Sequence, residues 1–197
     1  GMHGVFKDMN DAINASIEAQ KKVCTMTLDQ REQIISLIRK KTHENAEILA
    51  NMGVNETGMG NVGDKILKHH LTADKVPGTE DISTIAWSGD RGLTLVEMGP
   101  FGVIGAITPA TNPSETVICN CIGMLAGGNT VVFNPHPNAK KTTIYTINMI
   151  NEASIEGVGP DNIAVTGEAP TLATSAIMMK HQSIRLLLAM CGPGYVT

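Results

Sequence analysis

The stretches VIGAIT at residues 103–108 and TVVF at residues 130–133 decide the fold of this chain of 197 residues. Two further apolar runs follow, at residues 162–165 and 184–188. Helix-length segments lie between the runs, at residues 114–126, 139–152 and 171–181. Unbroken apolar strands that alternate with helices predict a parallel sheet covered by helices on both faces, an α/β fold.

The loop after each predicted strand is rich in Pro, Gly and Asn. Parallel sheets bind ligands beyond the carboxyl ends of their strands, so these loops are where we expect a site. The four loops are residues 109–113, 134–138, 166–170 and 190–194.

The first eighty residues are predicted to be helical. Apolar residues recur at helical spacing up to Val23, and Thr27 with Gln30 forms a capping-box pattern ahead of a second helix. Glycines interrupt the pattern near residue 60, and Pro77-Gly78 ends it. Residues 82–87 and 93–98 then read as two strands around a turn-rich segment, which predicts a hairpin. We therefore divide the chain into a helical part (1–80), a hairpin (81–98) and an α/β part (99–197).

Composition excludes several classes of protein. The 15 Lys and Arg against 19 Asp and Glu give a net charge of −4, which does not favour a nucleic-acid binder. With 42% hydrophobic and 17% charged residues, a buried core is expected rather than disorder. No apolar run reaches the roughly 20 residues that a membrane span needs. None of the four cysteines forms a CxxC pair, so we expect no zinc or other metal site and no disulfide framework, and a reducing cytoplasm is the default compartment.

Asn112 is the first candidate for chemistry. Pro109 and Pro113 bracket it at the end of a predicted strand, and each proline restricts its own backbone and that of its predecessor. A carboxamide held on so stiff a turn can donate to a developing oxyanion. The alternative, which the residues alone favour, is that Asn112 satisfies the turn or caps the next helix.

His136 is the second candidate, in the unusual segment Asn134-Pro135-His136-Pro137 between a strand and a helix. It could contact a ribose or a phosphate, because the N-terminus of a helix favours anions. The alternative is an exposed histidine at the entry of a helix. No GxGxxG motif follows any predicted strand, so the ordinary dinucleotide fingerprint is missing.

Taken together, these segments resemble the aldehyde dehydrogenase superfamily. The resemblance rests on GPFGVIGAITPATNP at residues 99–113 and LAGGNTVVFNPHP at residues 125–137. The NPHP segment, ETGMG at residues 56–60 and KVPGTED at residues 75–81 are similar to the CoA-acylating branch, the propionaldehyde and acetaldehyde dehydrogenases of propanediol and ethanolamine utilisation. The resemblance implies a Rossmann-like sheet and a hairpin of the oligomerisation type.

The resemblance also implies a reaction. In that family a cysteine thiolate attacks a short-chain aldehyde, hydride passes to NAD, and the resulting thioester is transferred to coenzyme A. Asn112 matches the catalytic asparagine that stabilises the oxyanion. Asn134 stands where other members carry a lysine that binds the adenosine ribose, so a weaker or rearranged contact is expected there. The positions matching the family's cofactor-binding residues are Thr108, Pro109, Ala110, Thr111, Asn134, His136, Pro137, Ala169, Pro170, Thr171 and Gly192.

The nucleophilic cysteine of the family lies in a later catalytic domain, so the resemblance implies an N-terminal portion that is inactive alone. Cys191 stands at a family glycine position and is rejected as a substitute, while Cys119 and Cys121 are expected to be buried hydrophobes. The resemblance further implies homo-oligomers and association with a bacterial microcompartment. Two other functions stay open: a nucleotide- or CoA-binding module without catalysis, and a dehydrogenase that forms free acids, against which the NPHP segment argues.

Overall fold

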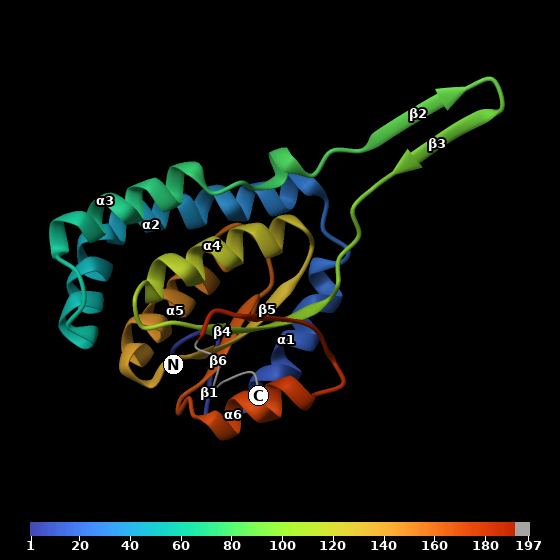
Figure 1. The fold of residues 1–197 in the computed structure, drawn as a ribbon. Coiled ribbons are helices and arrows are strands. Elements are labelled where there is room, and N and C mark those ends of the chain that lie inside the picture. Colours follow the sequence, from blue (N-terminus) through green and yellow to red (C-terminus); the bar gives the residue numbers. More distant parts are fainter. Residues whose placement is uncertain (192–197) are drawn as a thin grey trace.

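The fold is built on a five-stranded parallel sheet (Figure 1). The structure, a computed structural model, describes residues 1–191. The strands lie in the order β1-β6-β5-β4-β7, and every neighbouring pair is parallel. Their bounds are β1 Val5–Phe6, β4 Val103–Thr108, β5 Thr130–Pro135, β6 Ala164–Gly167 and β7 Ile184–Ala189. The predicted α/β, Rossmann-like class is confirmed. β1 is the strand that the sequence did not predict.

Side chains of the sheet alternate between two hydrophobic cores, as the period of two of a strand requires. Val131 and Phe133 of β5 belong to one core and Val132 belongs to the other. The first core is covered by α4 and α5, with α2 packed over them. The second is covered by α1 and α6. The helices are α1 Met9–Val23, α2 Leu28–Thr57, α3 Val62–Lys75, α4 Pro113–Ala126, α5 Lys140–Glu156 and α6 Leu172–Lys180, with short 3-10 turns η1 Thr79–Asp81 and η2 Pro137–Ala139.

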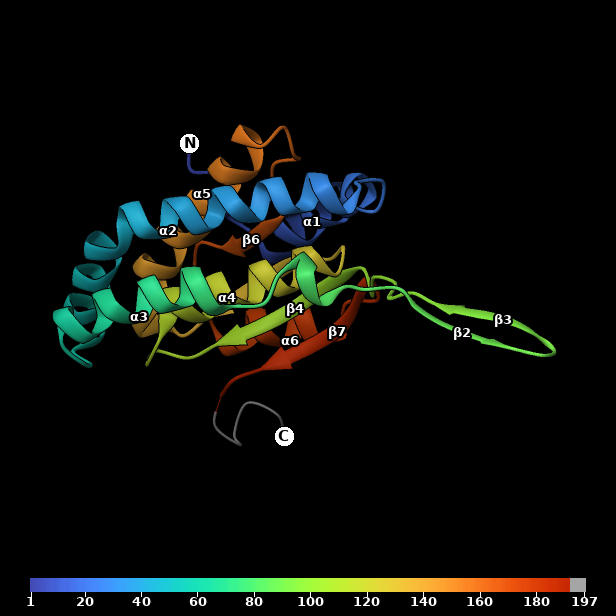
Figure 2. The same ribbon diagram turned by 90° about the horizontal axis from the view of Figure 1, so that it is seen from above.

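The strand order reverses at β4. From β4 the chain steps outward through α4, β5, α5 and β6, and it then returns through α6 so that β7 pairs with the other side of β4. α4 and α5 lie on one face of the sheet and α6 lies on the opposite face (Figure 2). Loops diverge at such a reversal, so a crevice opens beyond the carboxyl ends of β4, β5 and β7.

Side-chain hydrogen bonds cap the start of α2 and join its end to α5. The predicted capping box is present, because Thr27 and Gln30 bond reciprocally at the start of α2. At the other end of α2, the Glu56 carboxylate accepts hydrogen bonds from the backbone N–H of Lys141 and Thr142, each at 2.7 Å. A carboxylate there satisfies two unpaired N–H groups of α5 and complements its dipole. Glu56, part of the ETGMG segment, thus joins α2 to α5.

The hairpin of β2 Ile85–Gly89 and β3 Gly92–Val96 projects away from the rest of the molecule (Figures 1 and 2). The paired region is shifted toward the turn relative to the prediction: residues 82–84, 97 and 98 lie outside it, whereas Ser88, Gly89 and Gly92 belong to it. Every residue of both strands is exposed, including Trp87 and Leu95. An isolated two-stranded ribbon is marginal in water, and this one leaves its apolar side chains exposed.

Within residues 1–191, every helix is too short or too polar to cross a membrane.

Candidate active site

A cavity of about 510 Å³ lies at the reversal of the sheet, and we call it the strand-end cavity. Its walls come from the ends of β4, β5 and β7 and from the start of α6. Three of the four predicted loops thus meet in one place. The lining residues are Ile107, Thr108, Pro109, Ala110, Asn134, Pro135, His136, Pro137, Thr171, Leu172, Met190 and Cys191. The volume is within the usual range of small-molecule and cofactor sites.

Thr108 is a wall residue of this cavity with a buried, unpartnered hydroxyl. It is the last residue of β4, is 2% exposed, and its Oγ1 has no hydrogen-bond partner among the described residues. A buried hydroxyl without a partner costs about 1–3 kcal/mol, so such groups usually have a role. The mostly apolar walls and this one spare hydroxyl fit a nucleotide cofactor that makes few directed contacts.

Asn134 lines the cavity, but its carboxamide is bonded to α6. Its Nδ2 donates to Ser175 Oγ at 2.5 Å and to the carbonyl of Thr171 at 3.2 Å, and its Oδ1 accepts from Thr174 Oγ1 at 2.8 Å. Asn134 is 3% exposed. The side chain therefore fixes the start of α6, and neither of its N–H donors is free for the weaker or rearranged cofactor contact that the resemblance implied at this position.

His136 stands at the mouth of the strand-end cavity and is half-buried. Its Nδ1 accepts from the backbone N–H of Asn138 at 3.1 Å, which starts the turn η2. Nε2 has no partner among the described residues. His136 therefore caps a turn and still presents one ring nitrogen to a ligand.

Three residues expected at the cofactor lie outside the walls of the strand-end cavity. Thr111 is exposed, and its carbonyl accepts from Lys65 Nζ at 2.7 Å. Ala169 and Pro170 precede α6 and do not line the cavity, whereas Thr171, the N-cap of that helix, does. Gly192, the last expected cofactor residue, lies outside the described residues.

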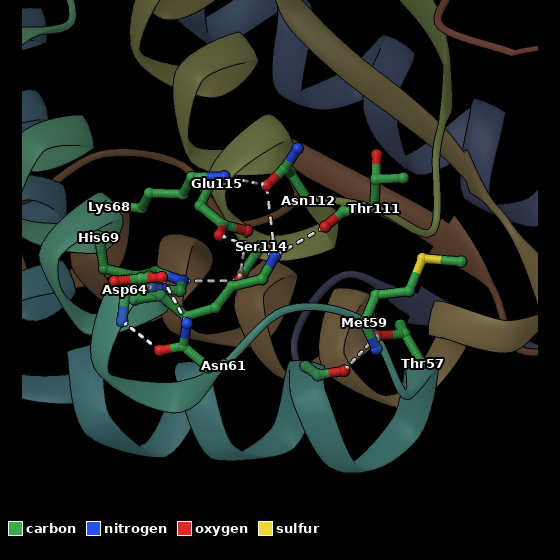
Figure 3. Close-up of polar contacts among 12 residues, drawn as sticks. Thr57, Met59, Asn61, Asp64, Lys68, His69, Thr111, Asn112, Ser114 and Glu115 are labelled. Carbon is green, nitrogen blue, oxygen red and sulfur yellow. Dashed lines mark hydrogen bonds and ion pairs between the residues drawn. The ribbon is translucent and has the colours of Figure 1, made fainter.

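Asn112 lines a second cavity of about 400 Å³, the α3–α4 cavity, beside the same loop. It is the N-cap residue of α4, yet its side chain makes no capping hydrogen bond. Instead, Oδ1 accepts from Lys65 Nζ and from Lys68 Nζ, each at 3.2 Å (Figure 3). Nδ2 points away from Lys68 and bonds to none of the described residues. The helix-cap interpretation is therefore wrong, and the amide N–H groups are free to donate.

Lys65 lies at the centre of a buried polar network. Only 5% of it is exposed, and its Nζ lies 3.2 Å from Glu115 Oε1. Glu115, on α4, is 6% exposed. The pair links α3 to α4, and the bonds from Lys65 to Thr111 and Asn112 link both helices to the loop after β4.

His69 extends the network one turn along α3. The ring is fully buried, with Nδ1 2.6 Å from the carbonyl of Lys65 and Nε2 2.7 Å from Ser114 Oγ. The carbonyl can only accept, so Nδ1 carries the proton and Nε2 accepts from the Ser114 hydroxyl. Burial lowers the pKa of His69, although the nearby Glu115 carboxylate opposes the shift. The ring is therefore neutral at pH 7 and ties α3 to the first turn of α4.

The cysteines near this network are poor nucleophiles. Burial raises the pKa of the Cys121 thiol, which is buried as predicted. Cys119 is half-buried rather than buried, because its side chain lines the α3–α4 cavity, and burial and the Glu115 carboxylate raise its pKa. Cys191 lines the strand-end cavity. Within residues 1–191 no three His, Cys, Asp or Glu side chains lie close enough to hold a metal ion.

Comparison with known proteins identifies the family of this chain. The family model described as "Aldehyde dehydrogenase family" matches residues 3–192. The chain belongs to the aldehyde dehydrogenase family. The acetaldehyde dehydrogenase (acetylating) of Bilophila wadsworthia is 46% identical over 196 residues, which are 100% of this chain and 40% of that protein. The resemblance to acylating members, through their N-terminal portion, is confirmed.

Two solved structures of relatives match closely. One is a propionaldehyde dehydrogenase from the Clostridium phytofermentans fucose utilisation bacterial microcompartment, with a TM-score of 0.96 and 69% identity over 98% of this chain and 45% of that one. The other is the Rhodopseudomonas palustris propionaldehyde dehydrogenase with bound propionyl-CoA, with a TM-score of 0.95 and 45% identity over 98% of this chain and 43% of that one. This member of the family thus spans less than half the length of these relatives.

Sequence reasoning missed the buried residues of α3, although this aldehyde dehydrogenase chain carries a signal for them. Lys65 and His69 occupy the buried face of α3, whereas Leu67 and Leu71 are 63% and 57% exposed. A helix that buries a lysine and a histidine and exposes leucines breaks the ordinary pattern. Such a break is expected where burial serves a site rather than the core.

The pH dependence of stability tests the neutral, buried His69. Because burial lowers its pKa, the unfolded chain binds more protons than the folded chain once the pH falls below about 6.5. Stability from this residue is therefore present above about pH 6.5 and lost on acidification, at up to about 1.4 kcal/mol per pH unit. We expect H69Q, which keeps an acceptor for Ser114, to unfold with a shallower dependence between pH 7.5 and 5.5, measured by urea titration. Parallel curves for the two proteins would show that His69 titrates normally.

Proposed function

We propose that this chain is the cofactor-binding portion of a CoA-acylating aldehyde dehydrogenase, which converts a short-chain aldehyde, NAD and coenzyme A to acyl-CoA and NADH. One observation carries the proposal. Asn112 offers a free carboxamide N–H pair at the loop between two cavities, one suited to a cofactor and one beside the amide. The names of the relatives, an acetylating and a propionaldehyde dehydrogenase, support the reaction class. They argue against a member that forms free acids.

The strand-end cavity is the proposed site of the nicotinamide cofactor. Thr108 would supply a hydroxyl, His136 a ring nitrogen, and Pro109, Ala110 and Pro137 apolar walls. Asn134 and Thr171 would act by holding the start of α6 against the cavity. When bound, NAD supplies the hydride acceptor of the oxidation. In this proposal residues 99–197 form the cofactor-binding part. The helical part, residues 1–80, packs against it, and the hairpin, residues 81–98, projects from it (Figure 1).

The α3–α4 cavity is the proposed site of the aldehyde. Attack of a thiolate on the aldehyde carbon places negative charge on the carbonyl oxygen, and an Asn112 N–H would stabilise that charge as it develops. The thiolate itself is proposed to come from a cysteine beyond residue 197. A chain without that cysteine binds ligands but does not turn over.

The same proposal covers partners and location. The exposed hairpin would pair with another subunit of a homo-oligomer, and the protein would work in the cytoplasm within a bacterial microcompartment. The microcompartment origin of the Clostridium phytofermentans relative supports this location. We propose no nucleic-acid or membrane partner.

Thr108→Val tests the cofactor site with the chain itself. Val has the shape of Thr and removes a hydroxyl that has no protein partner, so the free energy of unfolding should stay equal or rise. NAD affinity should fall by about 10-fold, the worth of one hydrogen bond. Thermal melting and calorimetric titration measure the two. Thr130→Val is the control: Thr130 bonds Ser16 at 2.9 Å and does not line the cavity, so it should lose stability and keep its affinity. Unchanged NAD binding by T108V would remove Thr108 from the site.

Asn112 is tested in a full-length enzyme, for which a chimera with the C-terminal part of the Clostridium phytofermentans relative serves. Asn112→Ala should lower kcat by about 10²–10³-fold, the usual loss for one oxyanion donor. The aldehyde KM should change much less, because the bond strengthens only in the transition state. Steady-state kinetics with aldehyde, coenzyme A and NAD measure both constants.

Asn112→Asp is the matched control for stability. It keeps an oxygen for Lys65 and Lys68 but has no N–H to donate, so kcat should fall at least as far as in N112A while the melting temperature holds. A variant that melts early yet turns over normally would mean that Asn112 is only a turn residue.

The hairpin is tested by placing charge on both of its faces. Trp87 pairs with Thr94, and Leu95 with Ala86, so the two side chains point to opposite faces. The double variant W87E/L95E in the full-length enzyme should give a smaller particle by light scattering, because charges cannot be buried cheaply at an interface. Val158→Glu, at an exposed apolar position elsewhere, should leave the particle unchanged. An unchanged mass for W87E/L95E would exclude the hairpin as the subunit contact.

A further inference from the structure

The buried ammonium of Lys65 bonds the side-chain oxygen of Asn112, and the proposed reaction gives Lys65 no role of its own. We propose that Lys65 is a positioning residue: with Lys68, it fixes and polarises the Asn112 carboxamide so that one of its N–H groups faces the reacting carbonyl oxygen. This inference rests on the proposed role of Asn112 as an oxyanion donor. It names the residue on which that role depends.

Charge alone sets the orientation of the amide. Oδ1 lies 3.2 Å from two ammonium nitrogens, one from Lys65 and one from Lys68. Rotating the amide by half a turn would place its NH₂ group, which cannot accept, against both cations. The two lysines therefore exclude the flipped form, and they leave the N–H pair on the side away from Lys68 (Figure 3).

Lys65 is held far more firmly than Lys68. Its ammonium has three oxygens around it, from Thr111, Asn112 and Glu115, and these use its three donors. The backbone carbonyl of Lys65 also lies 2.6 Å from Nδ1 of the His69 ring. Lys68 is exposed and bonds only the Asn112 oxygen among the described residues. Orientation of the amide therefore depends mainly on Lys65.

Stability does not explain this arrangement. A buried ion pair rarely stabilises a fold more than well-packed apolar residues would, because both charges lose their hydration. The ammonium also spends one bond on a half-exposed amide that the fold does not otherwise need. A cation on the oxygen of an amide strengthens the hydrogen bond that its N–H donates, because bonded groups polarise one another. That benefit appears when an anion forms opposite the N–H pair.

The test is a double-mutant cycle in the full-length enzyme. Removing Lys65 alone would leave Glu115 buried without its counter-ion, so every protein in the cycle carries E115Q, whose amide oxygen still accepts from Lys65. The four proteins are E115Q, K65M/E115Q, N112A/E115Q and K65M/N112A/E115Q. For each we would measure kcat, the aldehyde KM and the melting temperature.

We expect K65M to lower kcat by about 10- to 100-fold when Asn112 is present, part of the full value of the donor. In the N112A background it should lower kcat less than about 2-fold, because coupled residues are not additive. The aldehyde KM should move less than about 3-fold. Any loss of melting temperature should be equal in both backgrounds. Lys41→Met is the control. Lys41, a half-buried lysine of α2, pairs with Glu156 of α5 at 3.0 Å, and its loss should leave kcat unchanged.

Two results would overturn the inference alone: no fall in kcat for K65M, or the same fall with and without Asn112. An unchanged kcat for N112A/E115Q would instead overturn the proposed role of Asn112, and this inference with it. The two failures are distinguishable because a failure of the role of Asn112 is seen in N112A/E115Q, in which Lys65 is unaltered.

Discussion

The ammonium group of Lys65 is the contact on which the candidate site depends. It reaches from α3 to the loop after β4 and to the first turn of α4, with oxygens of Thr111, Asn112 and Glu115 around it. An ammonium group can donate to the Thr111 carbonyl and the Asn112 amide oxygen at once, which an apolar side chain cannot do. Helix α3 therefore takes part in the site, whereas α1 covers the second core of the sheet.

The sheet explains why the loops converge at all. Four strands and three of the helices between them were predictable, because short apolar runs alternate with segments of helix length. β4, β5 and β6 are buried on both faces, whereas β7 is an edge strand in which Leu186 and Leu187 are exposed. The reversal of strand order at β4 then follows from where α6 packs, which no local pattern records. Thr108, Asn112 and His136 could be proposed as site residues from the sequence because they stand at strand ends. Which of them share a cavity could not be predicted: Thr108 and His136 line the strand-end cavity, and Asn112 lines the α3–α4 cavity.

The features that the sequence did not predict depend on contacts between residues far apart in the chain. Val5 and Phe6 form β1 only because β6 offers its edge 160 residues later, and two residues are too few to show a period. Asn134 was expected at the cofactor, yet Ser175 and Thr174 of α6 take up its carboxamide. Lys65 and His69 were visible only as a violation of helical amphipathicity. Their buried positions make sense once Ser114 and Glu115 are seen opposite them.

The loop from Pro109 to Asn112 separates the two cavities, and Met190 lines both of them. An oxidation by hydride transfer requires the aldehyde carbon and the nicotinamide to approach within contact distance, so a thin partition is the geometry that the proposed reaction needs. A thin loop is also mobile unless it is held. Pro109 and Pro113 restrict its backbone, Lys65 bonds its carbonyl and its amide, and His69 fixes the helix that carries Lys65. Rigidity is thus supplied by α3, which bonds the loop without lining the strand-end cavity and so leaves that cavity free for the proposed cofactor.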